Sequence, residues 1–241
     1  MYRTIGIIGG MGPAATCDLM KKIIENTAAE DDQHHIHLVV DSNTSIPDRT
    51  AAILSGGESP VPEMVKSAVR LQAMGADFLI MPCNTAHYFC DQIRPFVEIP
   101  ILHMIRETAM RLKEQGIRKA ALLATNGTVR SGIYQGVMDE AGIELVYPSP
   151  DEQTFVMSLA YDWVKRGITD PKLLPGDRMR ELSNDLVGRG AERIILGCTE
   201  LPIAFAGLPE IPVSDPTLIL AEAAIRFAGA KTVADAENKK G

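Results

Sequence analysis

The chain of 241 residues is long enough for one large α/β domain or two smaller ones, and either size folds without disulfide bonds. Charged residues make up 23% of the chain and the apolar runs are too short to span a bilayer, which argues against a membrane protein or a membrane partner. The formal net charge of −7, without a cluster of basic residues, argues against nucleic acid as a partner.

The first ten residues, MYRTIGIIGG, hold one arginine and a short apolar run that leads directly into glycines. They lack the longer apolar segment and the small-residue cleavage site of an export signal. We therefore expect a cytoplasmic protein in which the four cysteines stay reduced.

Short apolar runs typical of buried strands alternate along the chain with amphipathic stretches typical of helices. The predicted strands are residues 4–9, 36–41, 77–82, 99–103, 119–125, 143–148 and 193–197. The predicted helices include residues 63–76, 105–116, 178–190 and 216–229, where apolar residues recur at steps of three and four. This alternation predicts parallel sheets joined by right-handed crossovers.

A glycine-rich loop follows the first predicted strand. Residues 10–15 fit the pattern Gly-x-Gly-x-x-Ala, and Asp41 ends the next strand, as in dinucleotide-binding proteins. A nucleotide-binding oxidoreductase is therefore one alternative. Pro13 removes one backbone N–H that could bind a pyrophosphate, and it also suits the first position of a helix. The same small residues would let the backbone approach a compact substrate.

Residues 45–62, SIPDRTAAILSGGESPVP, form a predicted loop that carries Arg49. An arginine there could bind a carboxylate through two parallel hydrogen bonds, or it could be a solvated loop charge. Lys165, near the end of a helical stretch, would by itself be interpreted as a solvent-facing lysine.

Two of the cysteines directly follow predicted strands: Cys83 in MPCNTAH and Cys198 in LGCTE. Parallel sheets bind ligands at this carboxyl edge. We interpret Cys17 and Cys90 as buried small apolar residues. The cysteines lack the paired CxxC spacing of a zinc site, and His87 is interpreted as a hydrogen-bonding residue, so we expect no metal.

The segment around Cys198 repeats the segment around Cys83. GADFLIMPCNTA from Gly75 aligns without a gap with GAERIILGCTE from Gly190, since 190 − 75 and 198 − 83 both equal 115. RTIGIIGGMGP, from residue 3, similarly matches KAALLATNGT, from residue 119.

The repeat predicts two similar Rossmann-like α/β domains with parallel sheets, related by a pseudo-twofold axis, with the active site in the cleft between them. The first domain would comprise residues 1–104 plus 214–229, and the second residues 105–213. Residues 230–241 are polar and lack an apolar face, so we expect a flexible tail.

Two such domains would present Cys83 and Cys198 to a small molecule from opposite sides. Stereochemical inversion needs two such acid/base groups, one deprotonated and one protonated at the start. Cysteine suits this chemistry because a helix amino terminus lowers the pKa of a thiol toward neutrality. Asn84, Thr85 and Thr199, which follow the cysteines, could hold a carboxylate.

The motifs GGMGP, PDRT, PCNTAH and GCTE, in this order and spacing, resemble those of the cofactor-independent aspartate/glutamate racemase family, and within it the aspartate racemases. The resemblance covers nearly the whole chain up to the final tail. It implies two α/β domains with the active site between them, and neither pyridoxal phosphate nor a metal. It further implies that Cys83 and Cys198 are the catalytic acid/base pair, acting on opposite faces of the substrate Cα.

The resemblance also implies roles for the neighbouring residues. Asn84, Thr85 and Thr199 would bind the α-carboxylate or the ammonium group, while Arg49 and Lys165 would recognise the side-chain carboxylate. The full set of predicted substrate-binding residues is Met11, Arg49, Asn84, Thr85, Thr128, Lys165, Thr199 and Glu200.

We therefore predict a cofactor-independent racemase that interconverts the L and D forms of aspartate, glutamate or both, and that forms a homodimer. Related enzymes of the wider superfamily, namely hydantoin racemase, maleate isomerase and arylmalonate decarboxylase, are alternatives. The nucleotide-binding oxidoreductase and a non-catalytic amino-acid sensor with the same cleft are further alternatives.

Overall fold

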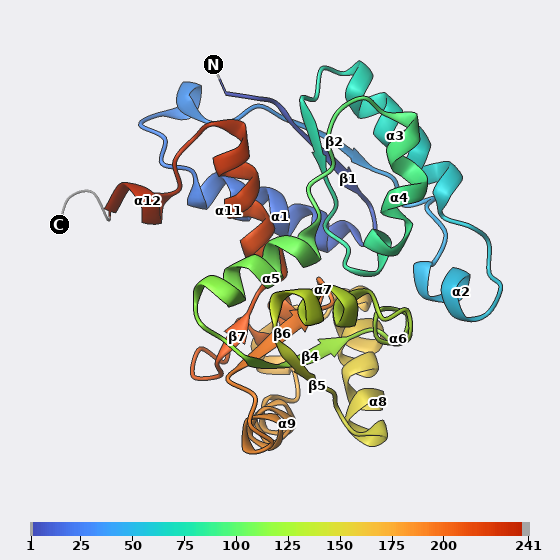
Figure 1. Cartoon of the computed structure of the whole chain (residues 1–241), viewed down its shortest axis with the longest axis vertical. Helices are drawn as coiled ribbons and strands as arrows, with labels where there is room; N and C mark the ends of the chain where they lie inside the picture. Colours follow the sequence, from blue (N-terminus) through green and yellow to red (C-terminus); the bar gives the residue numbers. More distant parts are fainter. Residues whose placement is uncertain (1, 238–241) are drawn as a thin grey trace.

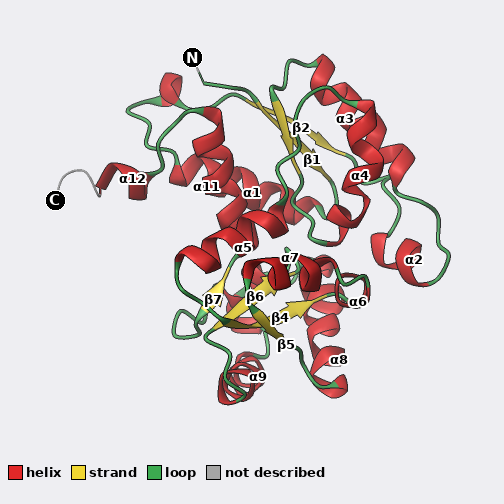
Figure 2. Ribbon diagram, viewed as in Figure 1, coloured by secondary structure: helices red, strands yellow, loops and turns green. Residues whose placement is uncertain are grey.

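Two parallel sheets with helices on both sides of their strands make up the protein (Figures 1 and 2). The computed structural model describes residues 2–237. The strand order is β2-β1-β3 in the first sheet and β5-β4-β6-β7 in the second, and the paired strands are parallel. The predicted α/β fold class is thereby confirmed.

The strands are short and lie close to the predicted positions. They are β1 (Ile5–Gly9), β2 (Leu38–Ser42), β3 (Phe78–Ile80), β4 (Lys119–Ala124), β5 (Glu144–Val146), β6 (Arg193–Gly197) and β7 (Val213–Ser214).

Helices follow most of the strands. They are α1 (Pro13–Asn26), α2 (Arg49–Leu54), α3 (Val61–Ala73), α4 (Cys90–Ile93), α5 (Met104–Glu114), α6 (Asn126–Arg130), α7 (Ile133–Ala141), α8 (Pro150–Ser158), α9 (Gly176–Gly188), α10 (Leu201–Phe205), α11 (Pro216–Ala228) and α12 (Val233–Glu237).

Helices bury both faces of each sheet. In the first sheet, Ile5 and Ile7 belong to a core shared with α1 and α11, whereas Ile8 belongs to a core shared with α3 and α4. In the second sheet, Leu122 faces α5 and α7, and Leu123 faces α8, α9 and α10. This division follows because successive side chains of a strand point to opposite faces. The carboxyl edges of both sheets are left free to form a site.

The internal repeat recurs in the backbone of the two halves. Gly75 and Gly190, which precede the equivalent strands β3 and β6, have nearly the same left-handed φ angles of 90° and 92°. Leu79 N–H donates to the carbonyl of Pro100 at 2.8 Å, and Ile194 N–H donates to that of Pro212 at 2.9 Å. The two halves therefore share backbone hydrogen bonds as well as sequence.

The predicted strand at residues 99–103 is reduced to a single parallel bridge between Leu79 and Ile101. Pro100 accepts a hydrogen bond from Leu79 but has no N–H to donate, so the ladder cannot lengthen at this position.

The chain passes between the two halves twice. At the start of α5, Met104 belongs to a core of the first half and Ile105 to a core of the second. The return is made through α11, which packs against both α1 and α5 (Figure 1). Arg111 on α5 and Glu222 on α11 form a partly buried ion pair that joins these two helices.

The division into residues 1–104 with 214–229 and residues 105–213 stays a prediction. It is supported by the placement of α11, whose apolar residues Leu220 and Ile225 share a core with β1 and α1.

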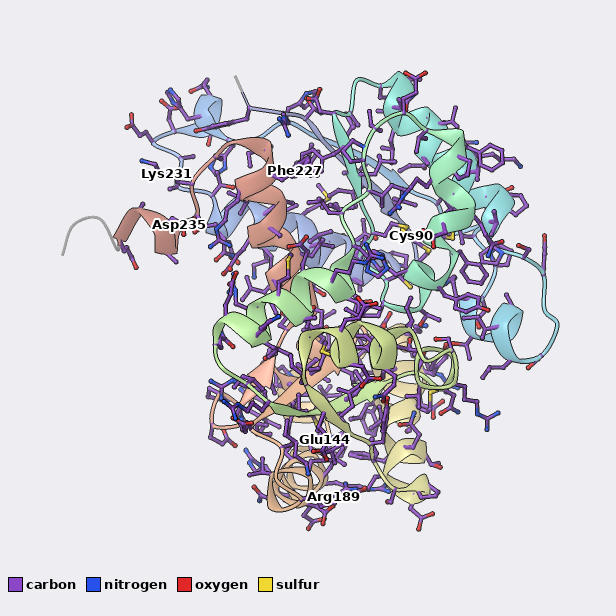
Figure 3. The ribbon with its side chains drawn as sticks, viewed as in Figure 1. Cys90, Glu144, Arg189, Phe227, Lys231 and Asp235 are labelled. Carbon is purple, nitrogen blue, oxygen red and sulfur yellow. The ribbon has the colours of Figure 1, made fainter. Side chains whose placement is uncertain are left out.

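Residues 230–237 differ from the flexible tail that we expected. Thr232 is 1% exposed and forms a bridge with Thr27. Asp235, labelled in Figure 3, lies on α12, and its carboxylate accepts a 2.9 Å hydrogen bond from Nε of Arg226. Polar contacts therefore order this segment although it lacks an apolar face. Residues 238–241 lie outside the described part of the chain.

No helix in the described range of residues has the length and apolar character needed to cross a bilayer.

Glycine at position 10 should be essential for the loop that follows β1. Its φ angle is +88°, and a Cβ placed there would lie 2.3 Å from the carbonyl carbon of Asn43. We expect Gly10→Ala to lower the free energy of unfolding by more than the roughly 1–2 kcal/mol of left-handed strain alone, because overlap with Asn43 adds to that strain.

Gly56→Ala is the matched control, since Gly56 has a φ of +65° but a Cβ placed there would have nothing within 4 Å. Urea unfolding followed by circular dichroism would compare the two variants. Equal shifts of the unfolding midpoint would contradict the overlap with Asn43.

Candidate functional site

The two cysteines that follow β3 and β6 line one cavity at the carboxyl edges of the two sheets. Cys83 and Cys198 are each 6% exposed. The cavity is narrow and takes its wall from both halves of the chain. Its lining residues are Met11, Asp48, Arg49, Thr50, Cys83, Asn84, Thr85, Thr125, Tyr161, Lys165, Cys198, Thr199 and Glu200.

Cys198 is held as a protonated thiol. Its Sγ donates a hydrogen bond to Oε2 of Glu200 at 2.9 Å. Burial raises the pKa of the Cys198 thiol well above its ordinary value, and the negative charge of Glu200 raises it further. At neutral pH this thiol is therefore a proton donor.

The expectation that a helix lowers the pKa of the catalytic thiols is wrong for Cys198. The following helix, α10, is only five residues long and begins three residues later, at Leu201. Burial and the adjacent carboxylate outweigh so weak and distant a helix dipole.

Cys83 lies beside the guanidinium of Arg49. Burial opposes the charge of Arg49, but the neighbouring Cys83 and Asp48 raise the pKa of the guanidinium above its ordinary value. Arg49 is the first residue of α2, and the Asp48 carboxylate caps this helix by accepting a hydrogen bond from Ala51 N–H at 2.7 Å. This cap fixes the start of α2 and therefore the position of the Arg49 backbone.

Backbone carbonyls hold the outer nitrogens of Arg49. Nη1 donates to Ile46 at 3.2 Å and to Pro47 at 2.8 Å, and Nη2 donates to Met11 at 3.3 Å. The buried Nε has no hydrogen-bond partner among residues 2–237. This leaves a donor on a cavity-lining side chain available to an anionic ligand.

Asn84 and Thr85 are tied to the second half of the chain. Asn84 Oδ1 accepts a hydrogen bond from the Tyr134 hydroxyl at 2.6 Å, and Thr85 Oγ1 lies 3.1 Å from Thr125 Oγ1 and 2.7 Å from Thr128 Oγ1. The amide nitrogen of Asn84 is buried and lacks a partner in the described structure. It is a second free donor in the cavity wall.

Thr128 is the predicted substrate-binding residue that does not line the cavity. It is fully buried behind Thr85, and its hydroxyl is within hydrogen-bond distance of both Thr85 and Thr125. Thr128 therefore supports Thr85, which lines the cavity. Each of the other predicted site residues does line the cavity.

Lys165 lies exposed at the rim of the cavity, with its Nζ 3.9 Å from the ring centroid of Tyr161. The surrounding protein atoms oppose the charge of the ammonium group, but the nearby Glu200 and Cys198 raise its pKa above the ordinary value. The lysine therefore remains a cation facing the cavity.

Four lining residues were not predicted as site residues: Asp48, Thr50, Thr125 and Tyr161. Thr125 follows β4, the strand equivalent to β1, so the repeat was a usable signal for it. Tyr161 lies in a π-helical turn, Leu159–Trp163, for which the sequence carries no motif.

The glycine-rich loop presents Met11 to the cavity, and its Gly12 lies near Glu200 of the other half. Asp41, the acidic residue of the dinucleotide-binding pattern, forms an ion pair with Arg70 at 3.2 Å. Pro13 begins α1, as expected. The loop therefore contributes to the same cavity as the cysteines.

The remaining thiols and histidines lie outside the cavity. Cys90 is buried, as expected, and burial raises its pKa to about 11, whereas Cys17 is exposed because it lies on the outer face of α1. The rings of His87 and His103 lie 4.5 Å apart between centroids with their planes tilted by 44°, and burial lowers the pKa of His103 to about 4. Among residues 2–237 no group of three or more side chains of His, Cys, Asp or Glu could hold a metal.

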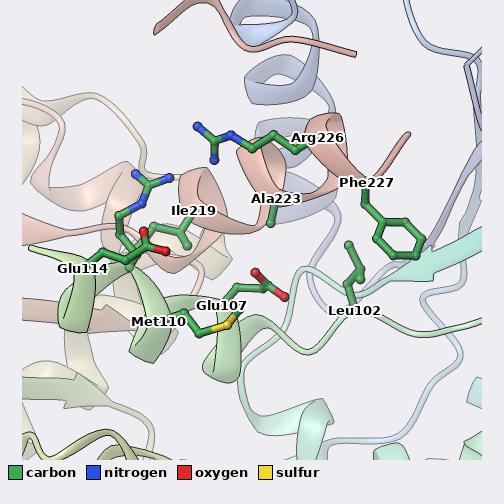
Figure 4. Close-up of a pocket in the computed structure, with 9 residues that line it drawn as sticks. Leu102, Glu107, Met110, Glu114, Ile219, Ala223, Arg226 and Phe227 are labelled. Carbon is green, nitrogen blue, oxygen red and sulfur yellow. The ribbon is translucent and has the colours of Figure 1, made fainter. Parts of the chain in front are cut away.

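A wider hollow of about 800 Å³ lies between α5 and α11 (Figure 4). Its wall includes Glu107, Glu114 and Arg226, and it contains neither of the cysteines that follow the strands. The smaller cavity is therefore the candidate active site.

Comparisons with known proteins identify the family to which this chain is similar. A family model described as Asp/Glu/Hydantoin racemase matches residues 8–224. The aspartate racemase of Picrophilus torridus is 36% identical and superposes with a TM-score of 0.84, over 95% of this chain and 96% of that one. An aspartate racemase homologue from Pyrococcus horikoshii is 27% identical, with a TM-score of 0.76, over 95% of this chain and all (100%) of the other.

Another relative is named for a wider activity. The broad specificity amino-acid racemase RacX of Bacillus subtilis is 27% identical over 227 residues, which cover 92% of this chain and 96% of that protein. The family match spans both Cys83 and Cys198.

Removing the charge of Glu200 should lower the pKa of Cys198. In Glu200→Gln the like-charge neighbour is lost while the burial remains, so thiolate forms at lower pH. The measurement is the pH profile of Cys198 alkylation by iodoacetamide, read by peptide mass spectrometry, because the thiolate is the reactive species. Glu25→Gln, on the exposed side of α1, serves as control, and an unchanged Cys198 profile in Glu200→Gln would contradict the assignment.

Proposed function

The chain belongs to the Asp/Glu/hydantoin racemase family, and from this premise we propose that it interconverts the L and D forms of an acidic amino acid, aspartate or glutamate. The observation that carries the proposal is the pair of cysteines, one from each half, that line one cavity. In this proposal Cys83 and Cys198 exchange protons with opposite faces of the substrate Cα.

The two thiols start the reaction in different states. Cys198 begins protonated beside Glu200, and in this proposal Cys83, which lies beside the positive charge of Arg49, acts first as the base. For one enantiomer, the Cys83 thiolate removes the Cα proton and the electron pair of the C–H bond stays on the substrate. The Cys198 S–H then donates its proton to the other face of Cα.

After this turnover Cys83 is a thiol and Cys198 a thiolate, and the opposite enantiomer can react from that state with the roles reversed. The two cysteines thus account for both proton transfers. This chemistry is why we propose that neither pyridoxal phosphate nor a metal takes part.

The donors around Cys83 would stabilise the negative charge of the intermediate. When Cα loses its proton, charge spreads onto the α-carboxylate, and fixed hydrogen-bond donors in a dry site stabilise such charge. This role is supported by the unpartnered amide nitrogen of Asn84 and by the position of Asn84 and Thr85 among the lining residues of the cavity. Thr199, which follows Cys198, also lines the cavity.

The acidic substrate class is supported by the two cations of the cavity. Arg49 offers a buried, unpartnered Nε, and Lys165 offers a charged Nζ at the rim. A substrate carrying a second carboxylate would interact with both. Aspartate and glutamate differ by one methylene, which changes binding by only about 1–3 kcal/mol, so both belong to the proposal.

We also propose a cytoplasmic homodimer. The dimer is supported by the resemblance to the aspartate/glutamate racemases, and the location by the free thiols on which the chemistry depends.

Loss of either cavity cysteine should stop inversion. We expect Cys83→Ala and Cys198→Ala each to lower racemisation at least about a hundredfold, the contribution of a positioned acid or base. Each enantiomer of aspartate and glutamate would be incubated in deuterium oxide, followed by optical rotation and Cα deuterium content. Cys198→Ala should still exchange the Cα proton of a single enantiomer, because Cys83 remains as a base, whereas Cys83→Ala leaves only the protonated Cys198 and should exchange neither.

The matched control for this experiment is Cys90→Ala, which removes a buried thiol outside the cavity and should retain activity. Normal inversion by both active-site variants would show that the cavity cysteines are structural. Absence of inversion and exchange in the wild type would refute the racemase itself.

Lys165 should matter more for acidic substrates than for neutral ones. Lys165→Gln removes the rim cation, so we expect kcat/KM for aspartate to fall about tenfold or more relative to kcat/KM for alanine. Lys172→Gln, an exposed lysine of the same half that does not line the cavity, is the control. Equal losses for both substrates would argue for a broad-specificity racemase in which Lys165 does not recognise the side chain.

A further inference from the structure

We infer that Tyr134 is a positioning residue for the substrate carboxylate, acting from the second half of the chain on Asn84 in the first. This inference rests on the proposed function, because it concerns how that same cavity binds its substrate. Tyr134 belongs to α7, and Asn84 directly follows Cys83. The two residues are 50 positions apart in the sequence.

Tyr134 can act only as a neutral hydroxyl at physiological pH. It is 1% exposed, and burial raises the pKa of its hydroxyl far above the ordinary value. A buried O–H group needs an acceptor. The acceptor is Oδ1 of Asn84, at 2.6 Å.

This hydrogen bond fixes the orientation of the Asn84 amide, with Oδ1 toward Tyr134. An asparagine amide offers an acceptor on one side and donors on the other, and its two orientations have nearly the same shape. Because Oδ1 is engaged by the tyrosine, Nδ2 is the end left without a partner among the residues described. Asn84 is 2% exposed and lines the cavity.

The orientation decides whether the residue attracts or repels a carboxylate. With Nδ2 toward the cavity, Asn84 donates a hydrogen bond to the anion. In the opposite orientation its Oδ1 would face the carboxylate oxygens, and two acceptors repel each other. Tyr134 therefore selects the binding orientation without contacting the substrate cavity, since it is not among the lining residues.

Thr85 is held in the same manner. Its hydroxyl lies within hydrogen-bond distance of Thr125 and Thr128, both from the second half. The two residues that follow Cys83 are thus both oriented by side chains across the boundary. The carboxylate site is complete only when the two halves are in contact.

The test compares Tyr134→Phe with Tyr147→Phe. The Tyr147 hydroxyl donates to Gln135, also on α7, at 2.8 Å, so its loss removes a similar hydrogen bond to the same helix without touching Asn84. We expect Tyr134→Phe to lower kcat/KM about tenfold for both enantiomers, since both carry the α-carboxylate. Tyr147→Phe should match the wild type.

A double-mutant cycle with Asn84→Ala separates positioning from general damage. Because Tyr134 acts through Asn84, the variant lacking both groups should be no slower than Asn84→Ala alone. Additive losses would overturn the inference, as would wild-type kinetics in Tyr134→Phe or in Asn84→Ala.

A measurement that needs no activity keeps the inference distinct from the proposed function. The side-chain ¹⁵N signal of Asn84, identified by its loss in Asn84→Ala, should report a rigid amide in the wild type and in Tyr147→Phe, and a mobile amide in Tyr134→Phe. A rigid amide in Tyr134→Phe would overturn the positioning role. A wild type that binds and racemises no amino acid would instead defeat the proposed function.

Discussion

The hydrogen bonds that cross from residues 84 and 85 to the second half are the interactions on which the cavity depends. Asn84 bonds to Tyr134, and Thr85 to Thr125 and Thr128, all at buried positions. Buried polar groups of this kind are costly to leave unpaired. These hydrogen bonds therefore join the two halves near the carboxyl edges of the sheets, where the cysteines lie.

A nearly symmetric backbone supports an asymmetric pair of thiols. The segments before Cys83 and Cys198 share their glycine conformations and their strand hydrogen bonds. The charges beside them differ in sign, since Arg49 lies near Cys83 and Glu200 near Cys198. The repeat thus brings two thiols to one cavity, and the side chains that do not repeat give those thiols oppositely charged neighbours.

The sheets and the two equivalent cysteines could be predicted because their sequence patterns repeat. Side-chain contacts between the two halves could not, because they have no repeated pattern. Continuous apolar runs and the offset of 115 residues predicted the parallel sheets and placed Cys83 and Cys198 at equivalent strand ends. Tyr161 and the supporting position of Thr128 depend on packing between the halves, which no local pattern encodes. The raised pKa of Cys198 likewise follows from burial, which the sequence does not display.

The two passages of the chain between the halves restrict how the protein can open. Both run through neighbouring helices, α5 and α11, which are linked by Arg111 and Glu222. Because these two connections lie next to each other, the halves could rotate about an axis through α5 and α11 more easily than they could separate along it. A rotation about that axis would move α2, which carries Arg49, away from α6, with which it is in contact in this structure.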